Sequence, residues 1–193
     1  MALTQAETVE ELEPQSGWFT ILTKPGCELM VHKGLSRTRY TTFYPFEARE
    51  RRDKRTGKMR VENRPYYPGY VFLRMEPFKP FWPVRHAPGV LTVLFDERGP
   101  YRLPDDEIER LRALCDENGQ LLPAEIPETL PARERYGRGT PVRIVQGPLI
   151  GFDGFVVKDD GPRIWVRVRP RAWGQGDWKT QLPEGAVQIL TEV

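Results

Sequence analysis

The sequence predicts an α+β domain that is joined by a linker to a small all-β barrel. The first part of the chain mixes short apolar runs with two segments of helical period. Residues 119–134 contain three prolines and no sustained period, which is typical of a linker. After the linker, short β runs alternate with glycine and proline turns as far as residue 193, and this pattern favours a small barrel.

The N-terminal domain is expected to span residues 17–118, with an antiparallel sheet and flanking helices. Gly17–Thr23 is an apolar run bounded by turn residues, and it predicts a strand. The apolar residues at positions 29, 30 and 35 predict a short amphipathic helix. Residues 41–46 predict a second strand, which Pro45 pushes toward the edge of the sheet.

A strongly basic segment follows. Residues 47–64 carry eight basic and four acidic side chains, and Thr56-Gly57 predicts the tip of a hairpin. Two interpretations of this segment stay open. It is either a solvated β-arm or a basic finger that points toward nucleic acid or an acidic partner.

Further apolar runs complete the N-terminal domain. Gly69–Met75 is almost entirely apolar and predicts a central strand, while residues 90–95 and 101–103 predict two more strands. An Asp-Asp pair begins a helix at residue 105, where the carboxylates suit the positive end of the helix dipole. Asn118-Gly119 is expected to end that helix.

The C-terminal domain is expected to span residues 135–193 and to consist of short strands at residues 141–145, 154–158, 163–168 and 187–190. The third of these reads RIWVRV, and side chains alternate between the two faces of a strand. Ile164, Val166 and Val168 therefore share one face, and the other face is shared by Arg163, Trp165, Arg167 and Arg169.

Composition excludes several classes of protein. The chain has 193 residues, a net charge of +2, 39% hydrophobic and 29% charged residues, which fits a soluble globular protein of one or two domains. Cys27 and Cys115 lack the spacing of a zinc site or a disulfide framework, so we expect no metal and a reducing, cytoplasmic compartment. No run approaches the ~18 apolar residues of a membrane span. Residues 1–16 lack the features of a signal peptide, and we interpret them as a flexible leader.

Signatures of catalysis are also missing from the sequence. His32 and His86 lie in no recognisable nucleophile context, and neither a GxGxxG nor a P-loop pattern occurs. Paired carboxylates occur where they begin a helix or lie in a turn. We therefore expect a protein that is not an enzyme and has no cofactor.

Two motifs carry a resemblance to a known family. The first is the aromatic-aromatic-Pro-Gly-Tyr-Val run of Tyr66–Val71, and the second is GPLIGFDGFVV at Gly147–Val157, which resembles a KOW motif. Together with the order of the predicted elements, they make residues 17–190 similar to the NusG family of bacterial transcription elongation factors. The resemblance implies an NGN domain at residues 17–118 and an SH3-like KOW barrel at residues 135–193.

The resemblance also implies the residues that dock on RNA polymerase. In the family, the N-terminal domain binds the clamp helices of the polymerase β′ subunit through an apolar depression that includes the aromatic-Pro-Gly-Tyr turn. Aromatic side chains are suitable interface anchors. The matching residues here are Phe43, Tyr44, Tyr66, Tyr67, Pro68 and Tyr70. The alternative interpretation is that tyrosines such as Tyr67 or Tyr70 face the core.

Three further surfaces follow from the resemblance. Upstream or non-template DNA would contact Lys24, His32, Lys33, Arg37, Arg85 and His86, although these residues also suit an ordinary solvated face. The polymerase β subunit would meet Phe81 and Trp82, where the chain departs from the His-Thr-Thr run of a specialised paralogue. A ribosomal protein or the termination factor Rho would contact the KOW domain through Trp165, Arg167, Arg169 and Trp173, or these residues would serve the barrel itself.

The function implied by the resemblance is that of a monomeric elongation factor that suppresses pausing or termination. The basic hairpin and the arginine-rich strand favour a specialised, RfaH-like paralogue that acts in antitermination. One alternative is a general NusG factor that couples polymerase to the ribosome or to Rho. A further alternative, from a different class, is a ribosome- or RNA-binding KOW protein.

Overall fold

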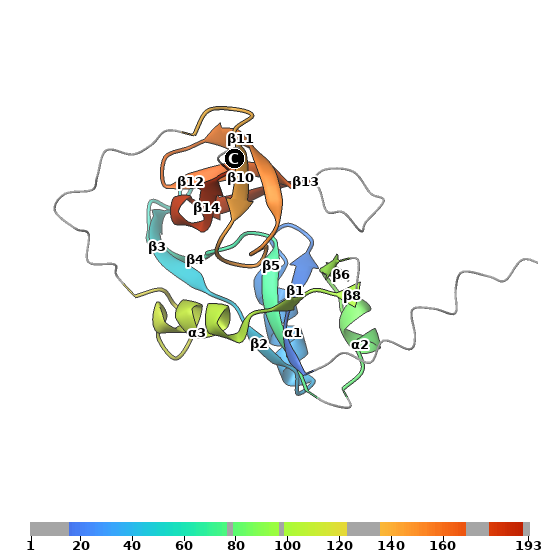
Figure 1. Ribbon diagram of the computed structural model, residues 1–193. Coiled ribbons are helices and arrows are strands. Elements are labelled where there is room, and N and C mark those ends of the chain that lie inside the picture. Colours follow the sequence, from blue (N-terminus) through green and yellow to red (C-terminus); the bar gives the residue numbers. More distant parts are fainter. Residues whose placement is uncertain (1–15, 77–78, 97–98, 123–135, 169–177, 191–193) are drawn as a thin grey trace, which may run out of the picture.

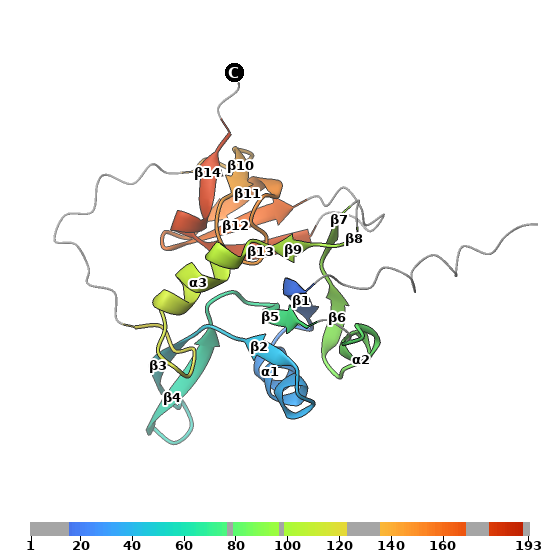
Figure 2. The same cartoon turned by 60° about the horizontal axis from the view of Figure 1, so that its bottom comes forward.

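The computed structural model of the chain describes residues 16–76, 79–96, 99–122, 136–168 and 178–190. The described residues form two five-stranded antiparallel sheets and two separate two-stranded ribbons. Figures 1 and 2 show the C-terminal sheet, in orange to red, packed on one side of the N-terminal sheet. The chain is therefore a mixed α/β protein built mainly from antiparallel strands.

The N-terminal sheet has the order β2-β5-β1-β6, and β9 also pairs with β1. Its strands are β1 (Gly17–Thr23), β2 (Thr41–Phe43), β5 (Tyr70–Met75), β6 (Val90–Val93) and β9 (Arg102–Leu103). The expectation that the apolar run at 69–75 is a central strand is confirmed, because β5 lies between β2 and β1. The predicted strand at 17–23 is confirmed as well.

Three helices are found among the described residues: α1 (Glu28–Arg37), α2 (Trp82–Arg85) and α3 (Asp105–Ala113). The sequence did not predict α2, because its prolines suggested a break. Pro83 nevertheless lies in the first turn of this helix, where a missing N–H has no consequence. The predicted end of α3 at Asn118-Gly119 is wrong. The Asp116 carboxylate accepts the backbone N–H groups of Asn118 and Gln120, and this turn follows the helix.

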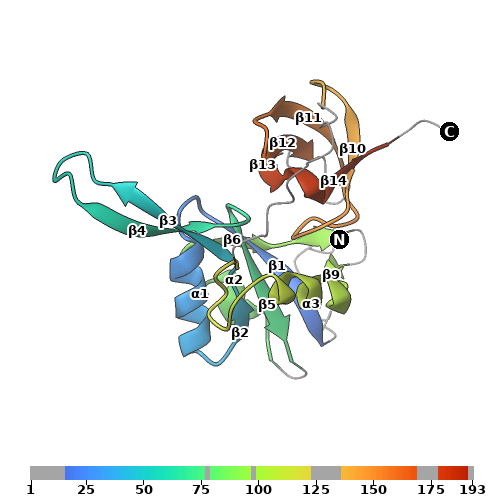
Figure 3. The same cartoon turned by 90° about the vertical axis from the view of Figure 1, so that its left-hand side faces the viewer.

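The basic segment forms a hairpin of β3 (Phe46–Arg52) and β4 (Met59–Pro65) that extends away from the body of the molecule (Figure 3). The predicted hairpin is thus confirmed, and the strand predicted at 41–46 is present as β2 at the edge of the sheet, but it is shorter than predicted. That strand ends at Phe43, and Pro45 lies buried at the junction, where its carbonyl accepts the Tyr66 N–H at 2.9 Å. Two short strands, β7 (Phe95–Asp96) and β8 (Gly99–Pro100), form a second small ribbon.

The C-terminal sheet has the order β13-β12-β11-β10-β14. Its elements are β10 (Pro141–Ile144), β11 (Asp153–Asp159), β12 (Arg163–Val168), β13 (Trp178–Pro183), a 3-10 turn η1 (Glu184–Ala186) and β14 (Val187–Ile189). The alternation predicted for RIWVRV is confirmed on its apolar side, where Ile164, Val166 and Val168 are fully buried. The sequence missed β13, since its WKTQLP segment offers little apolar alternation.

Residues 119–122, at the start of the predicted linker, are bonded to the base of the hairpin. The Phe46 N–H donates to the Gly119 carbonyl at 3.0 Å, and the Leu121 N–H donates to the Phe46 carbonyl at 2.8 Å. Residues 123–135 lie outside the described part of the chain.

Each face of the N-terminal sheet packs against a different layer. Along β5, Val71 and Leu73 belong to a buried cluster with side chains of α1 and α2, while Tyr70 and Phe72 belong to a second cluster with α3 and the C-terminal sheet. This division follows from the alternation of side chains along a strand. The second cluster therefore joins both sheets into one hydrophobic core.

The described residues contain no helix that is long and apolar enough to cross a bilayer. Within the same residues, no three side chains of His, Cys, Asp or Glu converge in a way that could hold a metal ion.

Candidate partner-binding surface

The aromatic turn, defined here as residues 66–70, connects the hairpin to β5. The Tyr70 N–H donates to the Tyr67 carbonyl at 3.2 Å, and Gly69 has a φ of +90°, which a residue with a side chain rarely adopts. The Glu28 carboxylate accepts the Gly69 N–H at 2.7 Å and fixes the turn to α1. The turn is therefore held in one conformation by a backbone hydrogen bond and by the Glu28 carboxylate.

The tyrosines of this turn are covered. Tyr67 and Tyr70 are each only 2% exposed, while Tyr66 is half-buried and lies edge-on to the Tyr67 ring at 4.8 Å. Burial raises the pKa of the phenol of Tyr67 and, to a smaller extent, that of Tyr66. The alternative interpretation of the sequence, that Tyr67 or Tyr70 packs in the core, describes both side chains in this structure.

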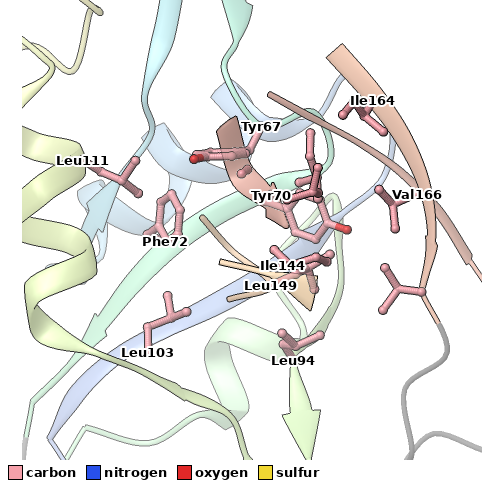
Figure 4. Close-up of a cluster of buried hydrophobic side chains, with 14 of the residues drawn as sticks. Tyr67, Tyr70, Phe72, Leu94, Leu103, Leu111, Ile144, Leu149, Ile164 and Val166 are labelled. Carbon is pink, nitrogen blue, oxygen red and sulfur yellow. The ribbon is translucent and has the colours of Figure 1, made fainter. Parts of the chain in front are cut away.

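The C-terminal sheet provides this cover. Figure 4 shows Tyr67 and Tyr70 in the same buried cluster as Ile144 and Ile164 of the C-terminal sheet and Leu149 of the loop between β10 and β11. At Gly147 the backbone lies directly on the Tyr67 ring, since a Cβ atom there would be 2.6 Å from the ring. The residues predicted to bind a partner thus bind another part of the same chain.

One loop supplies most of the polar contacts of this interface. The 147–152 loop, between β10 and β11, donates the Gly147 N–H to the Glu107 carboxylate at 2.6 Å. Its Pro148 carbonyl accepts the Thr20 hydroxyl at 3.0 Å, and its Ile150 carbonyl accepts the Tyr101 hydroxyl at 2.6 Å. These contacts satisfy polar groups that would otherwise be buried at a cost.

A single arginine fixes the other side of the interface. Arg163, at the start of β12, donates to the Tyr66 carbonyl, pairs with Glu47 at 3.2 Å and lies over the Tyr66 ring at 5.3 Å. Its burial lowers the pKa of the guanidinium, and Glu47 opposes that shift. The sequence placed Arg163 on the outer face of the strand. That face is covered here because the aromatic turn lies against it.

The other residues predicted to bind the clamp do not share one face. Phe43 stacks on Phe72 at 5.9 Å within the cluster that contacts the C-terminal sheet. Tyr44 belongs to the opposite cluster, where burial and the charge of Glu28 raise its pKa to about 12. Pro68 is partly exposed. The structure therefore brings Phe43, Tyr66, Tyr67 and Tyr70 together and leaves Tyr44 on the other side of the sheet.

Most of the residues predicted to contact DNA are exposed. Lys24, Lys33, Arg37, Arg85 and His86 are open to solvent. His32 is the exception, because its Nδ1 lies 2.8 Å from the Thr42 hydroxyl and its ring stacks on Tyr44. Burial, assisted by the charge of Lys33, lowers the pKa of His32.

The two remaining predicted surfaces are only partly available. Phe81 packs edge-on against Phe19 at 5.2 Å, whereas Trp82 is 67% exposed and stacks on His86 at 4.4 Å. In the C-terminal sheet, Trp165 is half-buried and donates its indole N–H to Asp160 at 2.9 Å. Arg167 is exposed, and Arg169 and Trp173 lie outside the described residues.

Sequence reasoning missed the residues that hold the two sheets together. Glu107 is only 3% exposed and points from α3 toward the 147–152 loop. A signal was present, because Glu107 precedes Leu111 by four residues and therefore shares the apolar face of that helix. A carboxylate on the apolar face of a helix indicates that a buried hydrogen-bond donor pairs with it. The sequence could not identify the Gly147 N–H as that donor.

Comparisons with known proteins locate the chain in a family. A family model described as transcription termination factor nusG matches residues 16–112. The transcription termination/antitermination protein NusG of Thermus thermophilus is 30% identical over 125 residues, and the match covers 62% of this chain and 65% of the relative. The chain therefore spans slightly less than two thirds of the length of that relative.

Two solved structures match over most of the chain. A structure described as domain interaction in Thermotoga maritima NusG is 20% identical, with a TM-score of 0.41 over 92% of this chain and 98% of that chain. The MjSpt4:Spt5 complex in conformation A is 15% identical, with a TM-score of 0.30 over 91% of this chain and 99% of that chain.

Proposed function

Because this chain belongs to the NusG family, we propose that it is a transcription elongation factor that binds bacterial RNA polymerase through the aromatic turn. The docking partner on the polymerase is the pair of β′ clamp helices. Tyr66, Tyr67 and Tyr70 are the anchors, with Phe43 beside them. Pro68 completes the turn, and Tyr44 supports it from the opposite face of the sheet.

The observation that carries this proposal is the way the aromatic turn is covered. A large aromatic patch left open on a free protein is a liability, and such patches mark sites of protein contact. Here the patch is closed by a part of the same chain that follows the predicted linker, residues 119–134. In this account the C-terminal sheet occupies the polymerase site in the free protein and leaves it when polymerase binds.

Release of the C-terminal sheet requires two separable domains. We propose the N-terminal domain at residues 17–118 and a KOW domain with a closed barrel at residues 135–193. A binding partner that contacts only the open form shifts the population toward it. The apparent affinity for polymerase is then lowered by the fraction of molecules that are closed.

The other predicted surfaces complete the proposed complex. Phe81 and the exposed Trp82 face the polymerase β subunit. Upstream or non-template DNA runs along Lys24, His32, Lys33 and Arg37, and along Arg85 and His86 at the end of α2. Once released, the KOW domain offers Trp165, Arg167, Arg169 and Trp173 to a further partner such as a ribosomal protein or Rho.

We propose suppression of pausing or termination as the outcome, in the manner of a specialised antitermination paralogue. Two features support a specialised role over a general one. The site is masked in the free chain, so it acts only after a releasing event. The hairpin of β3 and β4 is also strongly basic, with eight basic and four acidic side chains at residues 47–64. The run Phe81-Trp82-Pro83 departs from the His-Thr-Thr run of a specialised relative, so its contact with the β subunit would be a different one.

The experiment is a single-round transcription assay with purified bacterial RNA polymerase on a template that has a known pause and a terminator. The intact chain is compared with Tyr66→Ala, because Tyr66 is the half-buried anchor and its loss disturbs the core least. The matched control is Phe155→Ala, which removes a 51% exposed aromatic ring from the C-terminal sheet. Both variants are also tested for polymerase binding.

The proposal expects shorter pauses or more readthrough with the intact chain and with Phe155→Ala, and a weaker effect with Tyr66→Ala. Longer pauses that depend on Tyr66 would keep the docking site and reverse the direction of regulation. Absence of polymerase binding by the intact chain would overturn the proposal and favour a ribosome- or RNA-binding KOW protein.

A further inference from the structure

The tip of the hairpin carries a high net positive charge. Residues 51–60 contain six basic side chains and one acidic side chain, whereas the whole chain has a net charge of +2. The tip therefore has a net charge of +5, and the rest of the chain has a net charge of −3. Nothing in the proposed docking of the aromatic turn uses this charge.

The strand register shows that the charge is arranged in two different ways along the hairpin. At the base, Glu47 lies opposite Arg64, and Arg49 lies opposite Glu62, so each cross-strand pair is compensated. At the tip, Arg51 lies directly opposite Arg60 on the same face. Like charges in this position destabilise a hairpin. Folding alone gives no reason for the second arrangement.

The tip also has little internal compensation. The Arg51 guanidinium pairs with Glu62 at 3.2 Å, and Arg60 is 3.7 Å from Asp53. The Asp53 carboxylate already accepts the backbone N–H groups of Arg55 and Thr56, which form the turn. The side chains of Arg51 and Arg60 remain 65% and 69% exposed. These guanidinium groups are therefore open to an external anion.

The surface at the tip is concave. A hollow of about 560 Å³ is lined by five basic and two acidic side chains and one valine: Arg51, Arg52, Asp53, Lys54, Arg55, Arg60, Val61 and Glu62. Guanidinium groups bind phosphate oxygens in bidentate geometry. A cluster of such groups suits a polymer with regularly spaced phosphates better than it suits a single small anion.

We propose that the tip of the β3–β4 hairpin is a binding site for duplex DNA, separate from the residues predicted to contact DNA around α1. A two-stranded β-ribbon fits the major groove of B-form DNA. The strands of the hairpin each have seven residues, so the ribbon reaches about 20 Å from the body of the protein. That reach places the arginines on a duplex while the sheets stay clear of it.

The composition of the hairpin argues against the other nucleic acids. Binding of single strands relies on aromatic side chains on which bases stack, and residues 47–64 contain no Phe, Tyr, Trp or His. The major groove of A-form RNA is deep and too narrow for side chains to read. Duplex DNA is the partner that fits both the shape and the charge.

The test measures binding of the full chain to a labelled 20-base-pair duplex of arbitrary sequence, by fluorescence anisotropy over a series of salt concentrations. The test variant is Arg51→Ala/Arg60→Ala. The matched control is Arg138→Ala/Arg143→Ala, which removes the same charge from exposed positions of the C-terminal part. A third variant, Arg51→Lys/Arg60→Lys, keeps the charge and loses the bidentate geometry.

The proposal expects the test variant to bind at least tenfold more weakly at low salt. The slope of log affinity against log salt should become shallower by about 1.8, because two phosphate contacts are lost. The control should stay within twofold of wild type, and the lysine variant should lie between them. All positions are exposed, so the fold should be retained, and circular dichroism confirms this for each variant.

Three outcomes would overturn the proposal. The first is unchanged DNA binding in Arg51→Ala/Arg60→Ala. The second is loss of DNA binding in Lys24→Ala/Lys33→Ala/Arg37→Ala while the hairpin variant still binds. The third is tighter binding of a duplex RNA or a single strand of the same length. None of these measurements uses polymerase, so the result is independent of the proposed docking of the aromatic turn.

Discussion

The aromatic turn and the hairpin tip are neighbours in the sequence and opposites in the structure. The turn at residues 66–70 follows β4 directly, yet its tyrosines are buried beneath a part of the chain about 80 residues away. The tip at residues 51–60 extends away from the sheets and remains open to solvent. In the functions that we propose, the two partner sites are controlled in different ways, one by a cover that leaves on binding and the other by charge alone.

The largest expected effect is on the free energy of unfolding, when the Tyr67 side chain is removed from the interface between the two sheets. Tyr67→Ala removes a fully buried ring between the two sheets, and losses of this kind cost about 3–5 kcal/mol. The tip substitution Arg51→Ala should change the free energy of unfolding by about 0.5 kcal/mol or less. Urea unfolding of the two variants measures this contrast. Equal effects would mean that the tyrosine is not a core residue in solution.

A smaller effect is expected where one arginine ties the two sheets together. Arg163→Met keeps the apolar stem and removes the contacts to the Tyr66 carbonyl and Glu47, at an expected cost of about 1–3 kcal/mol. The control is Arg167→Met, an exposed position on the same strand.

Hydrogen exchange at the Gly147 amide reports this change, because that N–H is bonded across the interface to Glu107. Exchange should be about 5- to 150-fold faster in Arg163→Met than in the control, which corresponds to the expected ~1–3 kcal/mol. Equal exchange in the two variants would show that Arg163 does not hold the cover in place.

The covered site should also respond to high pH. Burial raises the pKa of the Tyr67 phenol above its ordinary value of 10.0, so the unfolded chain loses this proton first. The stability that comes from this group is complete below pH 10 and is lost as pH rises above it. Between pH 10 and 11, wild type should lose up to about 1.4 kcal/mol more than Tyr67→Phe. Parallel pH profiles would contradict the burial of this phenol.

The smallest effect on stability is expected at the tip of the hairpin, where a substitution should stabilise the protein and not destabilise it. Arg60→Glu replaces a like-charge pair with an opposite pair across the strands and should stabilise the hairpin by about 0.5 kcal/mol or less. The same substitution should abolish binding of duplex DNA. Thermal unfolding and anisotropy on one preparation measure both quantities. A variant that is stabilised and still binds DNA would show that the charge of Arg60 is not needed for DNA binding and would contradict the proposed site.

Local elements were predictable from the sequence because their signals are local. The alternation in RIWVRV, the apolar run of β5 and the Thr56-Gly57 turn of the hairpin all appear in the structure. The end of β2 at Phe43 was not predicted, since Tyr44 and Pro45 continue the apolar pattern while the chain turns away from the sheet.

The candidate site was predictable only in part. The aromatic content of residues 66–70 indicated a contact surface, but alternation along the strand could not tell a partner protein from another part of the same chain. The cover depends on contacts such as Gly147 with Glu107 and Arg163 with Tyr66, which join residues 40 and 97 positions apart. No local pattern encodes pairs at such separations.

The most direct test of the covered site uses two glycines of the C-terminal part. Gly147 and Gly139 have nearly the same φ, +89° and +87°, so alanine strains the backbone equally at both. Only at position 147 does the new Cβ meet the Tyr67 ring, whereas position 139 has no atom within 4 Å. Gly147→Ala should therefore push the C-terminal sheet off the aromatic turn, and Gly139→Ala should not.

The measurement is the affinity of each full-length variant for bacterial RNA polymerase. If the C-terminal sheet covers the docking site, Gly147→Ala should bind polymerase severalfold more tightly than wild type, because a larger fraction of molecules is open. Gly139→Ala should match wild type within twofold. Unchanged or weaker binding by a folded Gly147→Ala variant would contradict the central claim that the aromatic turn is a polymerase site masked by the chain itself.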